Sequence, residues 1–140
     1  MKRFNIRVYG ICVNEQREVL LSDERVRDFA FTKFPGGGLD WGEGTRECLQ
    51  REFMEEFGLE VETGRLFYLT DFFQQSAFNP DDQVVSVYYQ VNLPGSFDSA
   101  EVRGDKGETL RWKAIREMKS DDLTFPIDKK VLELLLLTYS

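Results

Sequence analysis

Apolar and polar residues alternate along several short stretches of the chain, and this two-residue period predicts β-strands. In the first stretch Ile6, Val8 and Cys12 fall on one face, as expected for a strand that buries one side. Polar stretches interrupt the pattern and are predicted as loops, at residues 23–31, 74–83 and 94–107. The predicted strands are residues 4–13, 18–22, 32–34, 61–73, 84–91 and 109–114.

A four-residue apolar period replaces this alternation in one segment and predicts a helix. Leu49, Phe53 and Phe57 recur at this spacing, so they form one buried stripe. We expect the helix to begin with Thr45 as its N-cap and to end at Gly58 as its C-cap.

A second helix is predicted at residues 127–139, directly after Pro126, with one helical turn before it at residues 115–118. Strands interrupted by two helices predict the α/β class, a mixed sheet with helices on both faces. A chain of 140 residues without a linker or repeat predicts a single domain over residues 1–140.

The formal net charge is −7, and the acidic residues are concentrated in one segment. Residues 37–59 carry a net charge of −4, whereas the remaining 117 residues carry −3. Nucleic-acid binding needs a basic face, so no nucleic-acid partner is expected. No apolar run is long enough to span a bilayer, and the start of the chain does not read as a secretory signal, so we expect a cytoplasmic protein without a membrane partner.

The chain contains no histidine, which excludes histidine-based catalysis and histidine-ligated zinc. Carboxylates, lysines and tyrosines are therefore the candidates for proton transfer. Cys12 and Cys48 are expected to be free thiols in a cytosolic protein.

Three carboxylates of the first predicted helix, Glu52, Glu55 and Glu56, have i, i+3 and i+4 spacing and share one face. Like charges at this spacing repel one another, and oxygen ligands of this kind suit Mg²⁺. A glycine-rich turn at residues 35–38 precedes the helix and lets the backbone approach a ligand closely.

Nine positions in residues 37–59 complete this pattern, which reads GGLDWGEGTRECLQREFMEEFGL. The segment resembles the signature of the Nudix hydrolases, MutT-like enzymes, at all nine positions. The resemblance implies the α/β/α sandwich of that family. It also implies hydrolysis of a phosphoric anhydride, the diphosphate linkage of a nucleoside diphosphate derivative, with Mg²⁺ or Mn²⁺ as cofactor.

The same resemblance implies roles for individual residues of this chain. Glu52, Glu55 and Glu56 are expected to bind the metal, together with the carbonyl oxygen of Gly36. Arg51 and Glu52 are the expected catalytic residues, and Glu52 acts either as the general base or only as a ligand. The structural support of the site is expected from Glu43 and Gly37.

Outside this segment Lys33, Phe34 and Glu108 are candidates for substrate binding, because they match positions that line the pocket or add a carboxylate in relatives. Phe34 is either a base-stacking ring or a core residue. Glu108 is either a site carboxylate or a surface residue at the start of a strand.

The predicted function is a pyrophosphatase of a small nucleotide, either a nucleoside triphosphate or a nucleotide sugar. The alternative is a non-catalytic nucleotide-sensing module, and the intact set of acids weighs against it. An RNA 5′-end pyrophosphohydrolase is disfavoured by the acidic balance. The sequence leaves a homodimer open, and it fixes neither the substrate nor the preferred metal.

Overall fold

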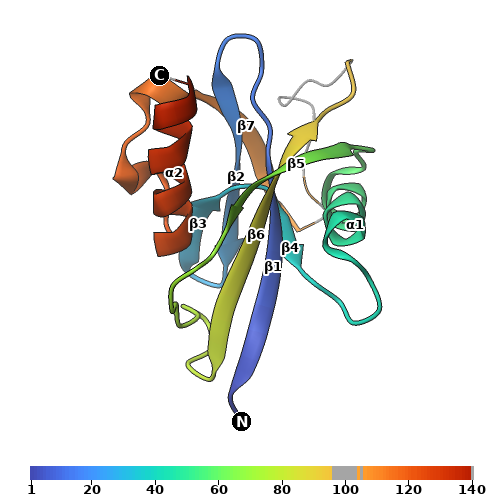
Figure 1. The fold of residues 1–140 in the computed structure, drawn as a ribbon, viewed down its shortest axis with the longest axis vertical. Helices are drawn as coiled ribbons and strands as arrows, with labels where there is room; N and C mark the ends of the chain where they lie inside the picture. Colours follow the sequence, from blue (N-terminus) through green and yellow to red (C-terminus); the bar gives the residue numbers. More distant parts are fainter. Residues whose placement is uncertain (96–103, 105, 140) are drawn as a thin grey trace.

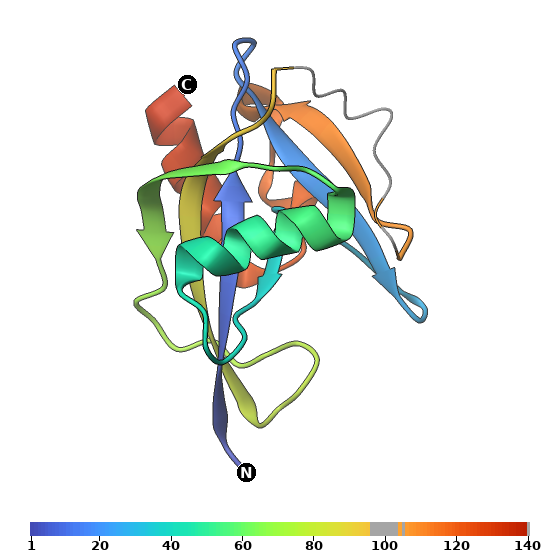
Figure 2. The same ribbon diagram turned by 90° about the vertical axis from the view of Figure 1, so that its right-hand side faces the viewer.

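The computed structural model describes residues 1–95, 104 and 106–139, which form two sheets between two α-helices (Figure 1). Helix α1 covers one side of the strands and α2 covers the other, as the view turned by 90° also shows (Figure 2). The elements are β1 (Arg3–Ile11), β2 (Glu18–Val26), β3 (Phe29–Lys33), β4 (Gly36–Gly38), α1 (Thr45–Phe57), β5 (Glu62–Leu69), β6 (Asp82–Asn92), β7 (Thr109–Ala114), η2 (Ile115–Glu117), η3 (Ser120–Asp122) and α2 (Pro126–Tyr139).

The first sheet is mixed and has the strand order β4-β1-β6-β5. β1 and β6 run parallel, while β4 and β5 are antiparallel to their neighbours. The second sheet, in the order β3-β2-β7, is antiparallel. These layers confirm the predicted mixed α/β fold with helices on both faces.

The strands form two sheets rather than the single sheet expected. β1 and β2 are joined close to their connection, where the Leu20 amide donates to the Cys12 carbonyl and Val13 bridges to Val19. β2 then pairs with β3 and β7, so the two sheets diverge from this junction.

Two hydrophobic cores lie between the layers. Under α1, Leu49, Phe53 and Phe57 are buried against Val8 and Leu20, which confirms the predicted apolar stripe. Under α2, a second cluster is buried; it includes Ile11, Leu21, Phe34, Tyr88, Val131 and Leu135. Each helix is therefore held by one apolar face, and burial of each large side chain contributes about 1.5–3 kcal/mol.

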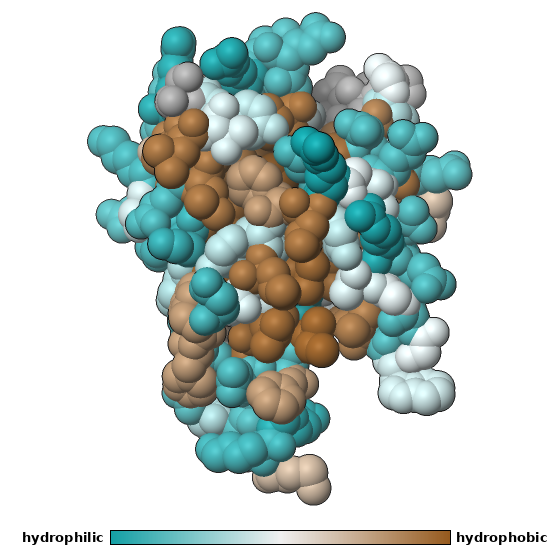
Figure 3. Space-filling view, viewed as in Figure 1, coloured by the Kyte–Doolittle hydropathy of each residue, from teal (hydrophilic) through white to brown (hydrophobic). Residues whose placement is uncertain are grey.

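Part of the apolar surface remains exposed. β5 is an edge strand of the first sheet and carries Leu66 and Leu69, whose side chains are exposed. Figure 3 shows apolar surface along the middle of the face that β5 crosses in Figure 1. No helix in the described part of the chain is both long and apolar enough to cross a membrane.

Several predicted boundaries are corrected by the structure. Residues 23–31 are not a loop, because β2 continues to Val26 and β3 begins at Phe29, with Arg27 at positive φ in the tight turn between them. The charged residues Arg25, Arg27 and Asp28 around this turn are exposed, which made two strands resemble a loop. The N-cap of α1 is Gly44, and Thr45 is the first helical residue.

Other predictions hold more closely. Gly58 adopts the left-handed conformation expected of a helix C-cap. The strand predicted at residues 61–73 ends earlier, at Leu69. Cys12 and Cys48 are free thiols, as expected. Most of the loop predicted at residues 94–107 lies outside the described residues.

One buried polar contact joins α2 to β6. The Tyr88 hydroxyl donates a hydrogen bond of 2.5 Å to the Asp128 carboxylate. Burial raises the pKa of Asp128 to about 6, although the bond from Tyr88 and the charges of Lys33 and Arg7 oppose the rise. The Asp128 carboxylate therefore costs stability when it is charged.

We predict that Asp128→Asn changes how stability depends on pH. Because the folded-state pKa exceeds the ordinary value of 3.8, the protonated carboxyl favours the folded state below about pH 4. This contribution is lost as pH rises through about 6, and its size is at most about 3 kcal/mol at about 1.4 kcal/mol per pKa unit. Urea unfolding of both proteins across this range should show wild type losing stability relative to the variant as pH rises. A difference that does not change with pH would contradict this.

Candidate active site

The glycine turn is held against β1 by strand pairing. In the β1–β4 register Tyr9 lies opposite Gly36, and Arg7 lies opposite Gly38. Gly36 has a φ of 147°, and a Cβ there would collide with the Val8 carbonyl oxygen. Only glycine fits this position, so the turn fixes where the Gly36 carbonyl oxygen points.

Gly37 leaves room for the carboxyl group of Glu52. A Cβ on Gly37 would lie 2.5 Å from the Glu52 carboxyl carbon and 2.6 Å from each of its oxygens. α1 therefore brings the Glu52 carboxyl group directly against the turn.

Arg51 connects the turn, the following loop and α1. Its guanidinium donates to both carboxylate oxygens of Glu43, at 2.7 and 2.9 Å, and to the Gly38 carbonyl at 3.1 Å. It also donates to Glu52 at 3.1 Å and to Glu55 at 3.0 Å. The bonds from Arg51 and from the Asp40 amide lower the pKa of Glu43 to about 2. A charged bidentate pair thus fixes the acidic helix against the turn.

Glu56 has a buried carboxylate oxygen, Oε2, without a hydrogen-bond partner. Burial raises the pKa of Glu56 to about 8, the nearby ammonium of Lys33 opposes this, and the charges of Glu24 and Glu52 add to it. A buried carboxylate oxygen without a donor is costly. A cation bound to this oxygen would remove the cost, so the residues here fit a divalent metal.

The predicted metal ligands are not all gathered at one point. The Glu55 carboxylate is more than half exposed and pairs with Arg51. Accordingly, no group of three His, Cys, Asp or Glu side chains suited to a metal ion occurs among the described residues. Glu52, Glu56 and the Gly36 carbonyl remain as the inner part of the predicted set.

The candidate substrate residues lie in three different surroundings. Lys33 is buried and lines a cavity. Phe34 is fully buried and meets the ring of Tyr88 edge-on, so it belongs to the core under α2 and does not line that cavity. Glu108 is also buried, and it accepts a hydrogen bond from the Lys106 amide.

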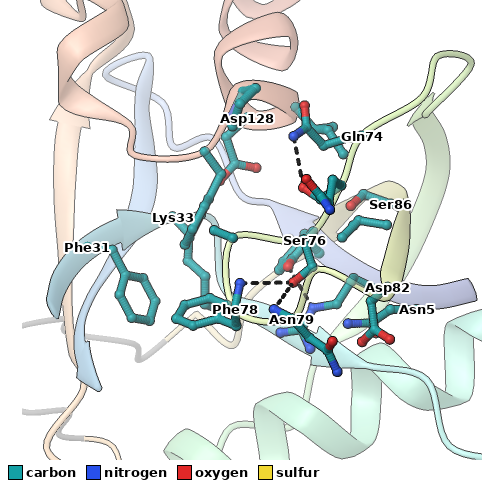
Figure 4. Close-up of a pocket in the computed structure, with 18 of the residues that line it drawn as sticks. Asn5, Phe31, Lys33, Gln74, Ser76, Phe78, Asn79, Asp82, Ser86 and Asp128 are labelled. Carbon is teal, nitrogen blue, oxygen red and sulfur yellow. Dashed lines mark hydrogen bonds between the residues drawn. The ribbon is translucent and has the colours of Figure 1, made fainter. Parts of the chain in front are cut away.

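The cavity has a volume of about 360 Å³ and opens between β3, β6, the segment after β5 and the start of α2 (Figure 4). The rings of Phe31 and Phe78 lie at one end, and Asp128 points in from α2. Ser76 holds the loop that carries Phe78 by accepting bonds from the amides of Phe78 and Asn79.

Several lining residues were missed by the sequence analysis. Arg7, Glu24 and Asp128 come from β1, β2 and α2, and no local motif marks them. Phe31 had a usable signal, because it lies two residues before Lys33 and therefore on the same face of a strand. Arg7 is also close to the predicted metal ligands, since it lies beside Gly38 and interacts electrostatically with Glu52.

Comparisons with known proteins identify the family of the chain. The chain matches the NUDIX domain family over residues 3–135, and it therefore belongs to the Nudix family. Membership confirms the predicted enzyme class, a pyrophosphohydrolase that acts on nucleoside diphosphate derivatives.

Solved structures with the same fold include the Escherichia coli ORF135 protein, 21% identical, with a TM-score of 0.76 and coverage of 97% of this chain and 91% of that one. The MutT Nudix hydrolase of Burkholderia pseudomallei is 23% identical, with a TM-score of 0.73 and coverage of 94% and 98%. A UDP-X diphosphatase is 19% identical, with a TM-score of 0.65, and the match covers 100% of this chain and 66% of that protein.

We predict that Gly37→Ala leaves the fold intact and impairs hydrolysis. The added methyl group displaces the Glu52 carboxyl, which is the mobile end of a side chain, and Gly37 does not need a positive φ. A displacement near 1 Å at a reacting group costs about 10²-fold in rate. The measurement is kcat together with circular dichroism.

Gly44→Ala is the matched control, because its φ is negative and its methyl group would meet only the end of the Glu47 side chain at 3.2 Å. Equal kcat in wild type and Gly37→Ala would show that the position of Glu52 against this glycine is not required.

Proposed function

We propose that this protein hydrolyses the diphosphate linkage of a nucleoside triphosphate or a nucleotide sugar in a reaction that depends on Mg²⁺ or Mn²⁺. The observation that carries the proposal is the buried, unpartnered Oε2 of Glu56 on the acidic face of α1, the face from which Glu52 lies against the glycine turn. A buried carboxyl group without a partner does not stabilise the fold. Its presence here suits a site that binds a cation.

The ion would be held by Glu52, Glu56 and the Gly36 carbonyl, with Glu55 joining them if it leaves Arg51. When bound, such an ion offsets the charge of the diphosphate oxygens and lowers the pKa of a bound water. Mg²⁺ usually keeps several waters and needs few protein carboxylates, so an inner set of three oxygen ligands is sufficient.

The side chains of the protein orient the catalytic carboxylate, accept the proton and bind the phosphate groups. Arg51 orients Glu52 by a hydrogen bond of 3.1 Å, and it is itself fixed by Glu43. Glu52 is then positioned to accept a proton from the attacking water. Arg7, held by the Tyr9 hydroxyl at 2.9 Å, places a positive charge between the acidic face and the cavity. This charge favours the binding of a phosphate group there.

The cavity supports binding of the nucleoside portion. Its volume of about 360 Å³ is that of a small-ligand pocket, and Phe31 and Phe78 offer apolar rings at one end. Asp128 and the polar side chains of the segment that carries Phe78 add hydrogen-bonding groups. A base bound there would leave its phosphates on the side of Arg7 and Lys33.

We predict that purified protein hydrolyses at least one member of a panel of nucleoside triphosphates and nucleotide sugars. EDTA should abolish the reaction, and Mg²⁺ or Mn²⁺ should restore it. Glu52→Gln should lower kcat by about 10²–10⁴-fold, the usual contribution of a general base. A much smaller loss that high metal concentration rescues would make Glu52 only a ligand. Binding of nucleotides without any hydrolysis would favour the sensing module.

We also predict that Phe78→Ala raises the KM for the nucleotide substrate with little change in kcat. Removing a stacking ring costs about 1–3 kcal/mol, a factor of about 10 to 10² in affinity. Phe73→Ala is the control, since Phe73 is exposed and does not line the cavity. If both variants leave KM unchanged, the nucleoside does not bind against Phe78.

A further inference from the structure

Lys33 is a buried lysine whose ammonium group contacts both the glycine turn and the wall of the cavity. Only 4% of the residue is exposed. Its Nζ forms an ion pair with Glu24 at 2.9 Å and donates to the carbonyl oxygens of Gly36 at 3.1 Å and Phe34 at 3.3 Å. The ammonium also lies 5.2 Å from the centre of the Tyr9 ring. These partners keep Lys33 charged, and its pKa is raised although burial acts against this.

The contact with Gly36 places this positive charge on a predicted metal ligand. The same ammonium interacts electrostatically with Glu56, although the two do not form an ion pair. A carbonyl oxygen that donates electron density to a divalent ion cannot keep a cationic donor at 3.1 Å without strong repulsion between the two cations. Lys33 and the ion therefore compete for one oxygen.

We propose that Lys33 is a displaceable internal cation of the metal site, which holds the Gly36 carbonyl until a divalent ion binds there and drives the ammonium away. The inference rests on the proposed function, because it assumes a divalent ion at Gly36, Glu52 and Glu56. Displacement needs no backbone movement, since Lys33 has a long side chain and keeps Glu24 as its partner.

The position of Lys33 among carboxyl groups stabilises the fold when no metal ion is bound. Glu24 on β2 and Glu52 and Glu56 on α1 bring three carboxyl groups together, and their mutual repulsion when charged would destabilise the fold without a counter-charge. Lys33 supplies that counter-charge from β3. The cost is weaker metal binding, because the ion must replace an existing contact of the Gly36 carbonyl.

The test is Mn²⁺ binding, measured by calorimetry, to wild type, Lys33→Met and Lys130→Met. Lys33→Met keeps the length of the side chain and removes both the charge and the contact, so its Kd should fall at least about tenfold. Lys130 is an exposed lysine of α2 that pairs with Glu133. Its substitution changes the net charge equally and should leave the Kd within about twofold of wild type. An unchanged or higher Kd in Lys33→Met overturns the proposal.

A measurement on the wild-type protein decides the matter if Lys33→Met does not fold. Nitrogen-15 NMR of the lysine side chains should show the signal of the buried Lys33 Nζ moving as Mg²⁺ is added, with the same Kd as calorimetry. A signal that stays fixed while calorimetry registers binding overturns the proposal. If wild type binds neither ion, the proposed metal site fails as a whole. If wild type binds the ion but the Lys33 signal does not move and Lys33→Met does not change the Kd, only this inference fails.

Discussion

The burial of negative charge against a glycine turn is the constraint on which the site depends. Glu52 lies against the backbone of Gly37, and Glu56 keeps a carboxylate oxygen out of water without a donor. Such a cluster persists only where other interactions hold it in place. Arg51 does this from within α1, because it bonds Glu43 and the Gly38 carbonyl while it also bonds Glu52. The apolar stripe of α1 then anchors the same helix to the sheet.

The cavity and the proposed metal site are joined through β3 and the glycine turn that follows it. Lys33 ends β3 at the cavity wall, and Gly36 begins the strand that faces the acidic helix. A nucleotide bound with its base near Phe31 would direct its phosphates toward this junction. The positive charges of Lys33 and Arg7 lie between the binding cavity and the acidic face, so one short segment couples substrate binding to the metal site.

The sequence predicted the parts of the site that are local and periodic. The spacing of Leu49, Phe53 and Phe57 placed the buried face of α1, and the family signature marked Arg51 and Glu43, which the structure pairs. Contacts between distant segments left no such signal. Glu24 meets Lys33, and Asp128 meets Tyr88 forty positions away, only because the sheets and α2 bring them together.

Phe34 shows how strand geometry decides between two roles that the sequence left open. Side chains alternate across a strand, so Phe31 and Lys33 share the cavity side while Phe34 turns to the core. The error at residues 23–31 has a related origin, since charged side chains on the exposed part of a hairpin look like a loop. Pairing of β2 with β3, which local composition does not encode, settles that segment as two strands.

The central claim is that a divalent ion binds at Glu56, and the most direct measurement is Mn²⁺ binding to wild type, Glu56→Gln and Glu60→Gln. Glu60 is an exposed residue after α1, so its substitution removes the same charge away from the site. The account predicts that wild type and Glu60→Gln bind Mn²⁺ with similar Kd, while Glu56→Gln loses most of the affinity. Equal binding by all three proteins would contradict it.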